Sequence, residues 1–561
     1  MKVVIIDGYV DEPACLGVPP YISPYPRYIA GALREHKIPQ QDIYYVTIDQ
    51  LRTSPEPAKN RIMSAGLVII IAGMTVPGKY LRASPITPGE IESIFSIVSG
   101  TKILGGPIRL GFSDEGGKTA SVPGIDAGDI NLAHADVEAF VYDILQSEEH
   151  LHDPENVVHR FRTVDEIARW SVNGAFIIKQ HPDHPDLMCE LETYRGCGRR
   201  KHCSFCTEPF YGSSDYRAVF DVVSEVSALY GAGARHFRIG RQPDLFTYHA
   251  TDTGGDIPEP DPYIIESLYR GIRNVAPGLR VLHMDNANPA TIAAYPEESR
   301  AIMKTIIKYH TSGDVAALGM ESADPKVVVA NDLKAMPEDV FEAIKLINDV
   351  GGMRGANGLP ELLPGLNFVH GLQGETKNTF GMNYDFMKTV LDADLLVRRI
   401  NIRQVMSFPG TPMFGKDVLV KKHKKMFLKY KQMVRKDIDL PMLRKLVPNG
   451  TILRDVMCEI SDHITFGRQL GSYPLLVGIP AKLPVGRFID VTVTGHGYRS
   501  ITGIPYPLKI NHAPMKLIRE LPGAGKKRTA KIINGVPYEN EQDFLDKNIT
   551  GQDLLRYITI P

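Results

Sequence analysis

The chain has 561 residues, 43% of them hydrophobic, which is enough for about three or four domains with large buried cores. Lysine and arginine number 64 and aspartate and glutamate 65, so the net charge of −1 gives no general support to polyanion binding. No apolar run approaches the ~20 residues that a membrane span needs. No secretory leader precedes the first strand-like run, so we expect a cytoplasmic protein with no membrane partner.

Residues 1–150 show strands alternating with helices. Apolar runs predict strands at 2–7, 43–48, 67–73 and 102–107, and composition predicts helices at 26–36 and 88–100. This alternation predicts an α/β fold with a doubly wound sheet, whose ligand would lie beyond the carboxyl ends of the strands. Gly73, Gly105 and Gly106 stand at those ends, where small residues let a large ligand approach the backbone.

Residues 151–184 form a predicted connector. Thr163 followed by Glu166 predicts a capping box that opens a short helix. The single tryptophan, Trp170, lies in that helix and is expected to pack inside the protein. The connector is therefore assigned a structural role.

Half of the six cysteines lie in one short segment. Cys197, Cys203 and Cys206 fall within ten positions, and three thiolates on one loop can hold three irons of a [4Fe–4S] cluster while the fourth iron stays open to substrate. A disulfide is disfavoured without a secretory signal. A zinc site would need a fourth ligand better placed than His202, and a four-cysteine cluster has Cys189 as its nearest candidate. The open cluster is favoured, with zinc and structural cysteines as alternatives.

Residues 416–449 form a predicted basic helical segment. Met426, Phe427, Tyr430 and Met433 are expected to form its buried face. The many lysines between them are expected to be a solvated face, and attraction to a phosphate backbone or an acidic protein is the alternative.

Two smaller units are predicted at the end of the chain. Residues 450–510 have strand composition and glycine punctuation, which favours a small β-rich domain in the form of a barrel. Residues 511–561 resemble a helix–hairpin–helix, with the hairpin at 521–525 and with Ala530 and Ile533 packing the second helix. In nucleic-acid binders the hairpin amides meet a phosphate, but such hairpins also serve as packing or protein-docking modules.

The cysteine spacing C-x5-C-x2-C, with Phe205 before the last cysteine, resembles the radical SAM superfamily, whose usual first gap is two residues shorter. Further family motifs follow in order. They are the second strand end at 235–242, the third strand at 281–288, a Gly-x-Glu-Ser strand end at 317–324, a Gly-Leu-Pro-Gly-Glu-Thr-like turn at 367–376 with Gln373 in place of proline, and the sixth strand with its Pro-Gly-Thr-Pro turn at 399–412. The resemblance covers residues 185–415 and implies a partial (β/α)6 barrel.

The same resemblance implies cofactors and the residues that hold them. It implies a [4Fe–4S] cluster on Cys197, Cys203 and Cys206, and bound S-adenosyl-L-methionine (SAM). By motif position, the implied SAM contacts are Phe205, Gly240, Arg241, Glu321, Ser322 and Gln404. No catalytic residue is assigned by motif position.

The N-terminal part resembles the cobalamin-binding domain that precedes the barrel in one branch of the superfamily. That branch has a proline-rich first loop and a Gly-Gly strand end, here 16–20 and Gly105 with Gly106. The implied cobalamin contacts are Leu16, Gly17, Gly73, Thr75, Val76, Gly105 and Gly106. The Asp-x-His-x-x-Gly signature of histidine-ligated cobalamin is absent, so the expectation is binding without a histidine axial ligand. A domain that keeps the fold and has lost the ligand is the alternative.

The resemblance also implies a reaction and a substrate class. In this superfamily an electron from a low-potential donor cleaves SAM to a 5′-deoxyadenosyl radical, which removes hydrogen from an unactivated carbon, and methylcobalamin then supplies a methyl group. The layout resembles archaeal, methanogen enzymes, which implies C-methylation as a post-translational modification. The specific expectation is a glutamine Cα of the methyl-coenzyme M reductase alpha subunit. Methylation or methylthiolation of tRNA is the alternative, and a non-catalytic binding module is a third, less favoured reading.

Overall fold

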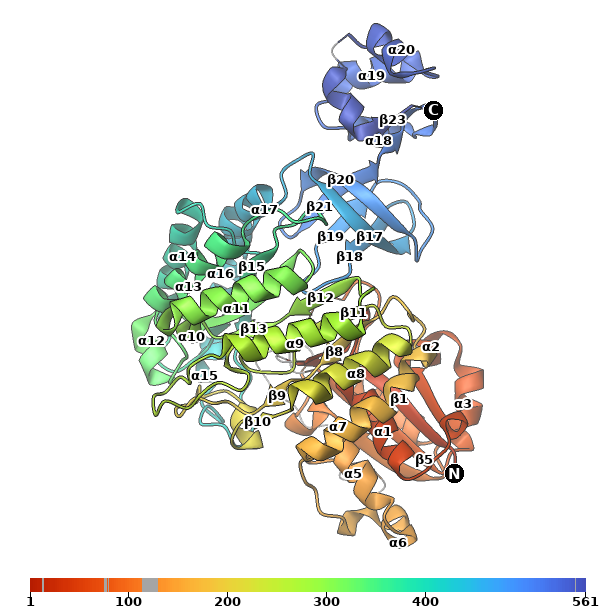
Figure 1. Cartoon of the computed structure of the whole chain (residues 1–561), viewed down its shortest axis with the longest axis vertical. Helices are drawn as coiled ribbons and strands as arrows, with labels where there is room; N and C mark the ends of the chain where they lie inside the picture. Colours follow the sequence, from red (N-terminus) through yellow and green to blue (C-terminus); the bar gives the residue numbers. More distant parts are fainter. Residues whose placement is uncertain (13–14, 75–77, 79, 114–129, 550, 561) are drawn as a thin grey trace.

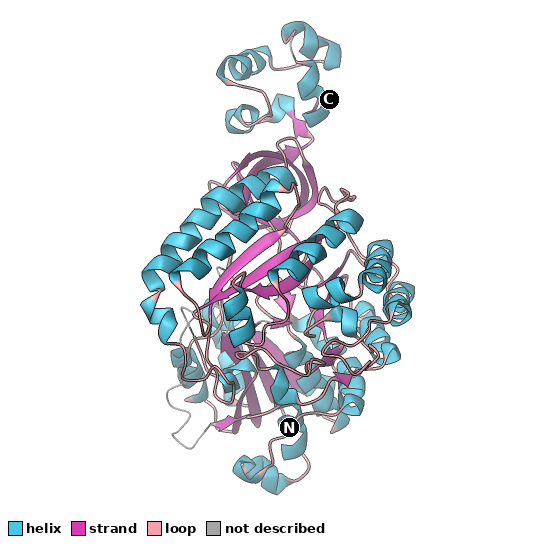
Figure 2. Cartoon of the chain, turned by 90° about the vertical axis from the view of Figure 1, so that its left-hand side faces the viewer, coloured by secondary structure: helices cyan, strands magenta, loops and turns pink. Residues whose placement is uncertain are grey.

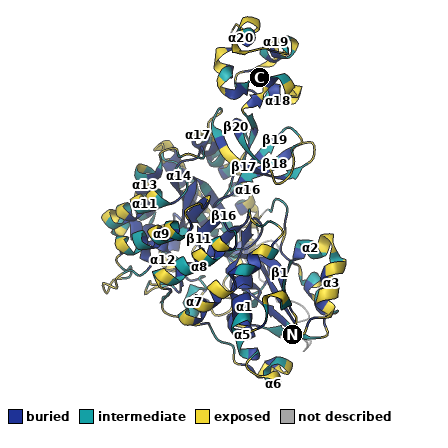
Figure 3. Ribbon diagram, turned by 45° about the vertical axis from the view of Figure 1, so that its right-hand side comes forward, coloured by how far each residue is buried: buried dark blue, intermediate teal, exposed yellow. Residues whose placement is uncertain are grey.

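The computed structural model describes residues 1–12, 15–74, 78, 80–113, 130–549 and 551–560. The N-terminal sheet lies against the central strands, the small barrel adjoins both, and the C-terminal helices lie at the opposite end of the molecule from the N-terminus (Figure 1). Burial is greatest along the central strands, and exposed residues gather on the outer helices and on the C-terminal unit (Figure 3).

The N-terminal sheet is doubly wound, as predicted. Its parallel strands lie in the order β4 (Ile43–Thr47), β1 (Val3–Glu12), β5 (Leu67–Met74), β6 (Thr101–Gly105) and β7 (Asn131–Leu132). This is the 2-1-3-4-5 order of flavodoxin-like sheets. Helices α1 (Pro24–Glu35) and α5 (Val137–Ile144) pack on one face, and α3 (Pro55–Met63) and α4 (Pro88–Phe95) on the other. Helix α4 ends before the predicted limit at residue 100.

The central unit is a partial barrel of parallel strands. Its strands follow the order β8 (Met188–Leu191), β11 (His236–Ile239), β12 (Val281–Met284) with β13 (Asn286–Ala287), β14 (Asp314–Glu321), β15 (Leu362–His370) and β16 (Arg399–Gln404). Asp285 alone separates β12 from β13, so the two act as one strand position. Helices α8 (Val219–Gly231), α9 (Pro262–Val275), α11 (Pro296–Tyr309), α13 (Pro337–Gly351) and α14 (Lys377–Asp392) cover the outside (Figure 2). The predicted partial (β/α)6 barrel is confirmed.

The proline-rich first loop joins the N-terminal sheet to this barrel. Its strand β3 (Tyr21–Ile22) pairs in parallel with β8, with Tyr21 opposite Met188 and Ile22 opposite Cys189. Because of this pairing the N-terminal sheet and the barrel share one continuous hydrophobic core. A two-residue strand inside a loop has no periodicity of its own, so the sequence did not predict it.

The connector carries helix α7 (Val164–Asn173), and its predicted capping box is confirmed. Thr163 and Glu166 satisfy each other's backbone amides. Trp170 is fully buried, as expected, and its indole nitrogen donates to Glu35 at 2.6 Å. The connector thereby fastens α7 against α1.

The basic segment is helical from Val418 to Leu446, in the pieces α15 (Val418–Lys422), α16 (Lys424–Val434), a π-helical turn (Arg435–Asp439) and α17 (Leu440–Leu446). Phe427 and Tyr430 are buried and Met426 is half-buried. Met433 was predicted to be buried and is 37% exposed, because the buried stripe continues through Val434 instead.

The small β-rich domain is a closed five-stranded barrel. Its strands lie in the order β17 (Ile452–Ser461), β18 (Thr465–Gln469), β19 (Leu476–Ile479), β21 (Ser500–Tyr506) and β20 (Phe488–His496). Its loop 470–475 reaches the central barrel, where the Ser472 amide donates to His283 at 2.8 Å and the Tyr473 hydroxyl donates to Asp285 at 2.7 Å. The Tyr21 hydroxyl donates to the carbonyl of Gly471. This loop therefore lies between β3 and the barrel interior.

The C-terminal unit contains the predicted helix–hairpin–helix, in α18 (Met515–Arg519) and α19 (Lys526–Gly535), followed by α20 (Glu541–Lys547). It has its own core. Thr529 and Ile532 face that core, whereas the predicted packing residue Ala530 is exposed and Ile533 is half-buried. In the part of the chain that the structure describes, no helix is long and apolar enough to cross a membrane.

Candidate functional site

The three cysteines lie on the loop that follows the first barrel strand, at its carboxyl end. Cys203 is buried, and Cys197 and Cys206 are half-buried. The amide of Cys206 donates to the carbonyl of Cys203 at 3.0 Å, which folds the last part of the loop into a tight turn.

A single carboxylate holds the longer first gap of the motif. Asp256 accepts the amides of Arg200 and Lys201, each at 3.1 Å, and pairs with the guanidinium of Arg199 at 3.1 Å. The ring of His202 contacts the carbonyl of Cys197 at 3.4 Å. The two additional residues of this gap are therefore tied into a defined loop.

The other side of the cysteine loop is anchored to the segments that follow strands β14 and β16. The amide of Ser204 donates to the carbonyl of Asn331 at 2.9 Å, and its hydroxyl donates to the side-chain oxygen of Asn331 at 2.8 Å. The amide of Met413 donates to the carbonyl of Ser204 at 2.9 Å. Residues from both ends of the barrel sequence therefore fix the position of Cys203.

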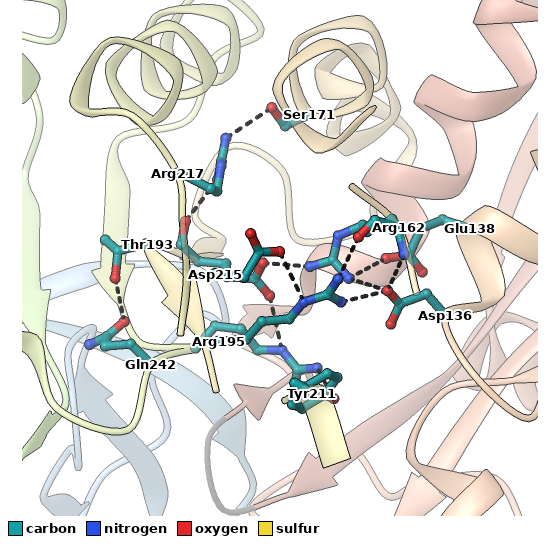
Figure 4. A network of polar contacts seen from close by, with 12 residues as sticks. Asp136, Glu138, Arg162, Ser171, Thr193, Arg195, Tyr211, Asp215, Arg217 and Gln242 are labelled. Atoms are coloured by element: carbon teal, nitrogen blue, oxygen red, sulfur yellow. Dashed lines mark hydrogen bonds and ion pairs between the residues drawn. The ribbon is translucent and has the colours of Figure 1, made fainter. Parts of the chain in front are cut away.

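A buried network of charges holds the start of the loop (Figure 4). Asp136 receives Arg195 at 2.5 Å and Arg162 at 3.0 Å, and Arg162 also pairs with Glu138 at 2.9 Å. Thr193 donates to Gln242 at 3.3 Å. Since Asp136 and Glu138 come from the N-terminal domain, the network locks the cysteine loop to that domain.

Lys334 lies beside all three thiols. Burial raises the pKa of the Cys197 and Cys206 thiols, and that of the Cys203 thiol to about 11, while the charge of Lys334 opposes these shifts. Burial alone lowers the pKa of Lys334, but the three thiols and Glu321 outweigh it and raise that pKa overall. The site thus places one cation where three thiolates would carry negative charge.

Glu321 ends strand β14 in an unusual conformation. Its φ is +60°, in the left-handed region that residues with a Cβ avoid. The side chain is 8% exposed, one carboxylate oxygen has no hydrogen-bond partner among the described residues, and burial raises the pKa of the carboxyl to about 7. A strained, buried carboxylate next to Lys334 has features that gather at functional sites, which makes Glu321 a candidate functional residue.

The other residues with an implied SAM contact have different surroundings. Phe205 packs in the small core that contains Cys203 and Cys206. Ser322 accepts the amide of Asp324 at 3.1 Å, and Gln404 donates to the carbonyl of Val420 at 3.3 Å.

Gly240 and Arg241 lie toward the N-terminal domain. A Cβ on Gly240 would collide with the carboxylate of Glu190, so that carboxylate needs the glycine. Arg241 forms an ion pair with Glu12 at the end of β1, and donates to Tyr211 at 3.3 Å. Arg241 therefore joins the carboxyl ends of the two sheets.

Other parts of the chain occupy some of the space beside the residues with an implied cobalamin contact. A Cβ on Gly73 would meet Ile108, one on Gly105 would meet Val137, and one on Gly106 would meet Ala72. Gly17 packs against Val10 and Ser23, and Leu16 packs beside Tyr21. Thr75 and Val76 lie outside the described residues. The glycines therefore let neighbouring loops approach each other at the carboxyl edge of the sheet.

Polar side chains line that same edge. The hydroxyl of Tyr80 donates to Asp11 at 2.7 Å, and that of Tyr25 donates to Glu12 at 3.0 Å. Burial raises the pKa of Asp11 to about 6. The hydroxyl of Tyr21 is directed away from this edge, toward the small barrel.

Several residues of the site had no signal in the sequence. Lys334, Asp256 and Asn331 lie in loops without a motif and reach the cysteines only through the fold. A pocket next to Cys197 is lined by Lys334, Asp244 and Thr291 among others. Across the described ranges, no group of three or more His, Cys, Asp or Glu side chains forms a site for a single metal ion.

Comparison with known proteins gives the relationship of this chain. No family model matches it. It is 46% identical over 513 residues to uncharacterized protein MJ0274 of Methanocaldococcus jannaschii, covering 90% of this chain and 93% of that protein. It is 44% identical over 524 residues to an uncharacterized protein of Archaeoglobus fulgidus, covering 93% of each.

A solved structure with a similar fold is that of the cobalamin-dependent S-adenosylmethionine radical enzyme OxsB, with aqua-cobalamin and S-adenosylmethionine bound. The TM-score is 0.50 at 14% identity, over 78% of this chain and 56% of OxsB. That likeness extends to the α/β architecture. The two archaeal relatives extend over nearly the whole length, and this chain belongs to the protein family that contains MJ0274.

Proposed function

We propose that the protein is a cobalamin-dependent radical SAM enzyme that transfers a methyl group to an unactivated carbon. The observation that carries this proposal is the gathering of three cysteine thiols, Lys334 and Glu321 at the carboxyl end of a parallel barrel. The carboxyl ends of parallel strands are where such folds hold their reactive groups. The carboxyl edge of the N-terminal sheet adjoins this site through the Arg241–Glu12 ion pair.

The cofactors proposed are a [4Fe–4S] cluster, SAM and cobalamin. Cys197, Cys203 and Cys206 would hold the cluster. The SAM contacts proposed are Phe205, Gly240, Arg241, Glu321, Ser322 and Gln404, and the cobalamin contacts are Leu16, Gly17, Gly73, Thr75, Val76, Gly105 and Gly106. The architecture shared with OxsB, which binds both aqua-cobalamin and S-adenosylmethionine, supports this set.

The residues of the chain would bind, orient and exclude water. Lys334 would offset the charge of the three thiolates. Glu321 is buried, and one of its carboxylate oxygens has no partner among the described residues, so it can accept a hydrogen bond from a hydroxyl or an ammonium group of SAM. When bound, the cluster supplies an electron and cobalamin supplies the methyl group. A low-potential electron donor is required as a partner.

The substrate proposed is a protein or peptide, with a glutamine Cα of the methyl-coenzyme M reductase alpha subunit as the specific candidate. The net charge of −1 favours a protein over a polynucleotide. The test is anaerobic incubation of the reconstituted enzyme with a peptide from that subunit or with unmodified tRNA, followed by mass spectrometry. A mass gain on the peptide supports the proposal, and a gain on the tRNA alone contradicts it.

Cys203→Ala tests the cluster assignment. Because the loop would lose one of three iron ligands, we expect the cluster's visible absorption to be lost, and SAM cleavage to 5′-deoxyadenosine to fall by a factor of about 1,000 or more. Cys458→Ala is the matched control, since Cys458 is a buried free cysteine in the small barrel. Retained SAM cleavage in Cys203→Ala would sink the scheme.

A further inference from the structure

The last barrel strand presents cations toward the barrel interior. Side chains alternate along a strand, and Ile400 and Ile402 of β16 pack in the hydrophobic core. Arg399, Asn401 and Arg403 therefore project from the opposite face. Within the described residues β16 pairs with β15 alone, so these side chains lie at the open edge of the partial barrel.

Arg399 is fixed in position by uncharged groups. Its Nε donates to the side-chain oxygen of Asn401 at 2.6 Å, and its guanidinium lies 4.9 Å from the ring centre of Tyr473. Asn401 in turn donates to Asn367 at 2.9 Å. Among the described residues no group accepts a hydrogen bond from its terminal nitrogens. The guanidinium is therefore held in place while the N–H groups of its terminal nitrogens remain available to a ligand.

Two further arginines lie close to it. Arg499, from the loop between β20 and β21, donates to the carbonyl of Ile400 at 3.4 Å, and this places it beside Arg399. Arg435, from the π-helical turn, lies close enough to Arg499 to lower its pKa, a smaller effect than burial. We call Arg399, Arg403, Arg435 and Arg499 the arginine group. Burial first, and then the charges of Arg499 and Arg403, lower the pKa of Arg399 to about 10.

Acidic groups do not balance the arginine group. Asp439 lies 4.0 Å from Arg499 and is the only carboxylate, among the described residues, within 4.0 Å of any of its four members. Asp11 and Glu321 act on Arg399 or Arg403 only over longer distances. Four guanidinium groups thus share one close carboxylate.

Two other buried arginines are each matched by acids. Arg238 pairs with both Glu190 and Asp285. Arg162 pairs with three carboxylates, those of Asp136, Glu138 and Glu192. Like charges held together in a poorly solvated place cost free energy unless an anion joins them. The arginine group is therefore arranged for an anion that the chain does not supply.

We infer that the arginine group binds a carboxylate of the methyl acceptor, so that the substrate is a peptide segment with an acidic side chain close to the methylated residue. Assigning this anion to the methyl acceptor rests on the proposed function. The planar guanidinium matches a carboxylate with two parallel hydrogen bonds. Asp11 and Glu321 interact electrostatically with Arg403, and Asp439 lies 4.0 Å from Arg499, so these carboxylates would repel a chain of phosphates more than a single carboxylate, and a peptide fits better than RNA.

The test is calorimetric titration of the full reconstituted protein with two blocked peptides, Ac-Gly-Glu-Gln-Glu-Gly-NH2 and its all-glutamine counterpart. We expect the acidic peptide to bind about tenfold more tightly, as one charge-assisted pair provides. Arg399→Gln and Arg403→Gln should each reduce that preference to less than about threefold. Arg270→Gln, an exposed arginine on helix α9, is the matched control and should keep it.

Three outcomes would overturn the inference. The first is equal binding of both peptides to the wild type, and the second is a preference that survives in both variants. The third is Arg403-dependent binding of a 12-nucleotide single-stranded RNA that is tighter than binding of the acidic peptide. Circular dichroism confirms folding of each variant. If the wild type cleaves SAM but shows no preference, this inference alone fails. If the wild type shows the preference but does not cleave SAM, the proposed function fails, and the peptide carboxylate is no longer assigned to a methyl acceptor.

Discussion

At the scale of single residues, Glu321 combines two energetic costs at one position. A non-glycine residue in the left-handed region costs ~1–2 kcal/mol. Its carboxylate is buried, and one oxygen lacks a partner among the described residues. Its charge lies beside Lys334, close to the cysteines. Backbone strain at such a position is retained when the side chain has a functional role.

Glu321→Gly should separate stability from binding. Glycine adopts a positive φ without strain, so we expect the free energy of unfolding to rise by about 1 kcal/mol. The carboxylate is lost at the same time, so SAM affinity should fall by about tenfold. Urea unfolding and equilibrium dialysis with SAM measure the two effects.

Glu321→Gln is the matched control for that change. The Gln variant keeps the strained backbone and removes the charge. Its affinity for SAM should therefore fall, but its free energy of unfolding should not gain from relief of strain. A Gly variant that is less stable than the wild type and binds SAM equally well would contradict the role given to Glu321.

At the scale of elements, two helices cross in backbone contact. A Cβ on Gly31 of α1 would lie 2.0 Å from the carbonyl oxygen of Trp170 in α7, and one on Gly174 would lie 1.8 Å from the carbonyl oxygen of Arg27. Arg27, on the same helix, forms a buried ion pair with Glu225 of α8. Helix α1 therefore belongs to the N-terminal domain and to the barrel wall at once.

Gly31→Ala should be strongly destabilising. The methyl group would meet backbone atoms that cannot move aside, so we expect a loss of about 3 kcal/mol or more in the free energy of unfolding. Gly381 on α14 is a suitable comparison, because a Cβ there meets nothing within 4 Å. Gly381→Ala should raise stability by about 0.5–1 kcal/mol. Similar effects of the two changes in urea unfolding would argue against the tight crossing.

Much of the architecture could be predicted from the sequence, because long apolar runs and turn residues are local signals. Four strands of the N-terminal sheet (β1, β4, β5 and β6), the capping box at Thr163 and the terminal hairpin are of this kind, whereas the two-residue strand β7 was not predicted. The burial of Met433 and Ala530 was misjudged because a helix face is fixed only by what packs against it.

The surroundings of the cysteines were less accessible to prediction. Lys334 and Asp256 reach the cysteine loop from distant parts of the chain, and no local pattern marks them. The same holds for strand β3, whose pairing with β8 depends on where the whole first loop lies. The residues with proposed SAM and cobalamin contacts stay a prediction that binding experiments must test.

At the scale of the whole molecule, the hydrophobic cores do not coincide with the domains predicted from the sequence. One hydrophobic core includes residues of the N-terminal sheet, the connector, the barrel and the helices up to Met442. The small barrel shares a hydrophobic core with α17 and with Leu359 and Leu363, at the start of strand β15 of the central barrel. The C-terminal unit has a core of its own, in contact with the small barrel through Ile504 and Ala481.

Calorimetric unfolding should therefore show two transitions. A chain lacking residues 507–561 should lose the smaller transition. The midpoint temperature of the larger transition should change by less than about 3 °C, because the core of the remaining domains is intact. Deletion from residue 450 onward is the contrasting case. It exposes the core that the small barrel shares with the central barrel and α17, so it should markedly lower the midpoint temperature of the larger transition. A single transition in the full chain would contradict the independence of the C-terminal unit.

The contact between Tyr21 and Gly471 has a consequence for biosynthesis. The two residues are 450 positions apart in the sequence. A ribosome completes the cysteine loop long before it reaches the loop 470–475 that closes over the barrel interior. During translation the nascent chain therefore passes through a stage in which the three cysteines are present and this loop does not yet cover the barrel interior, and final closure waits for nearly the last domain to emerge.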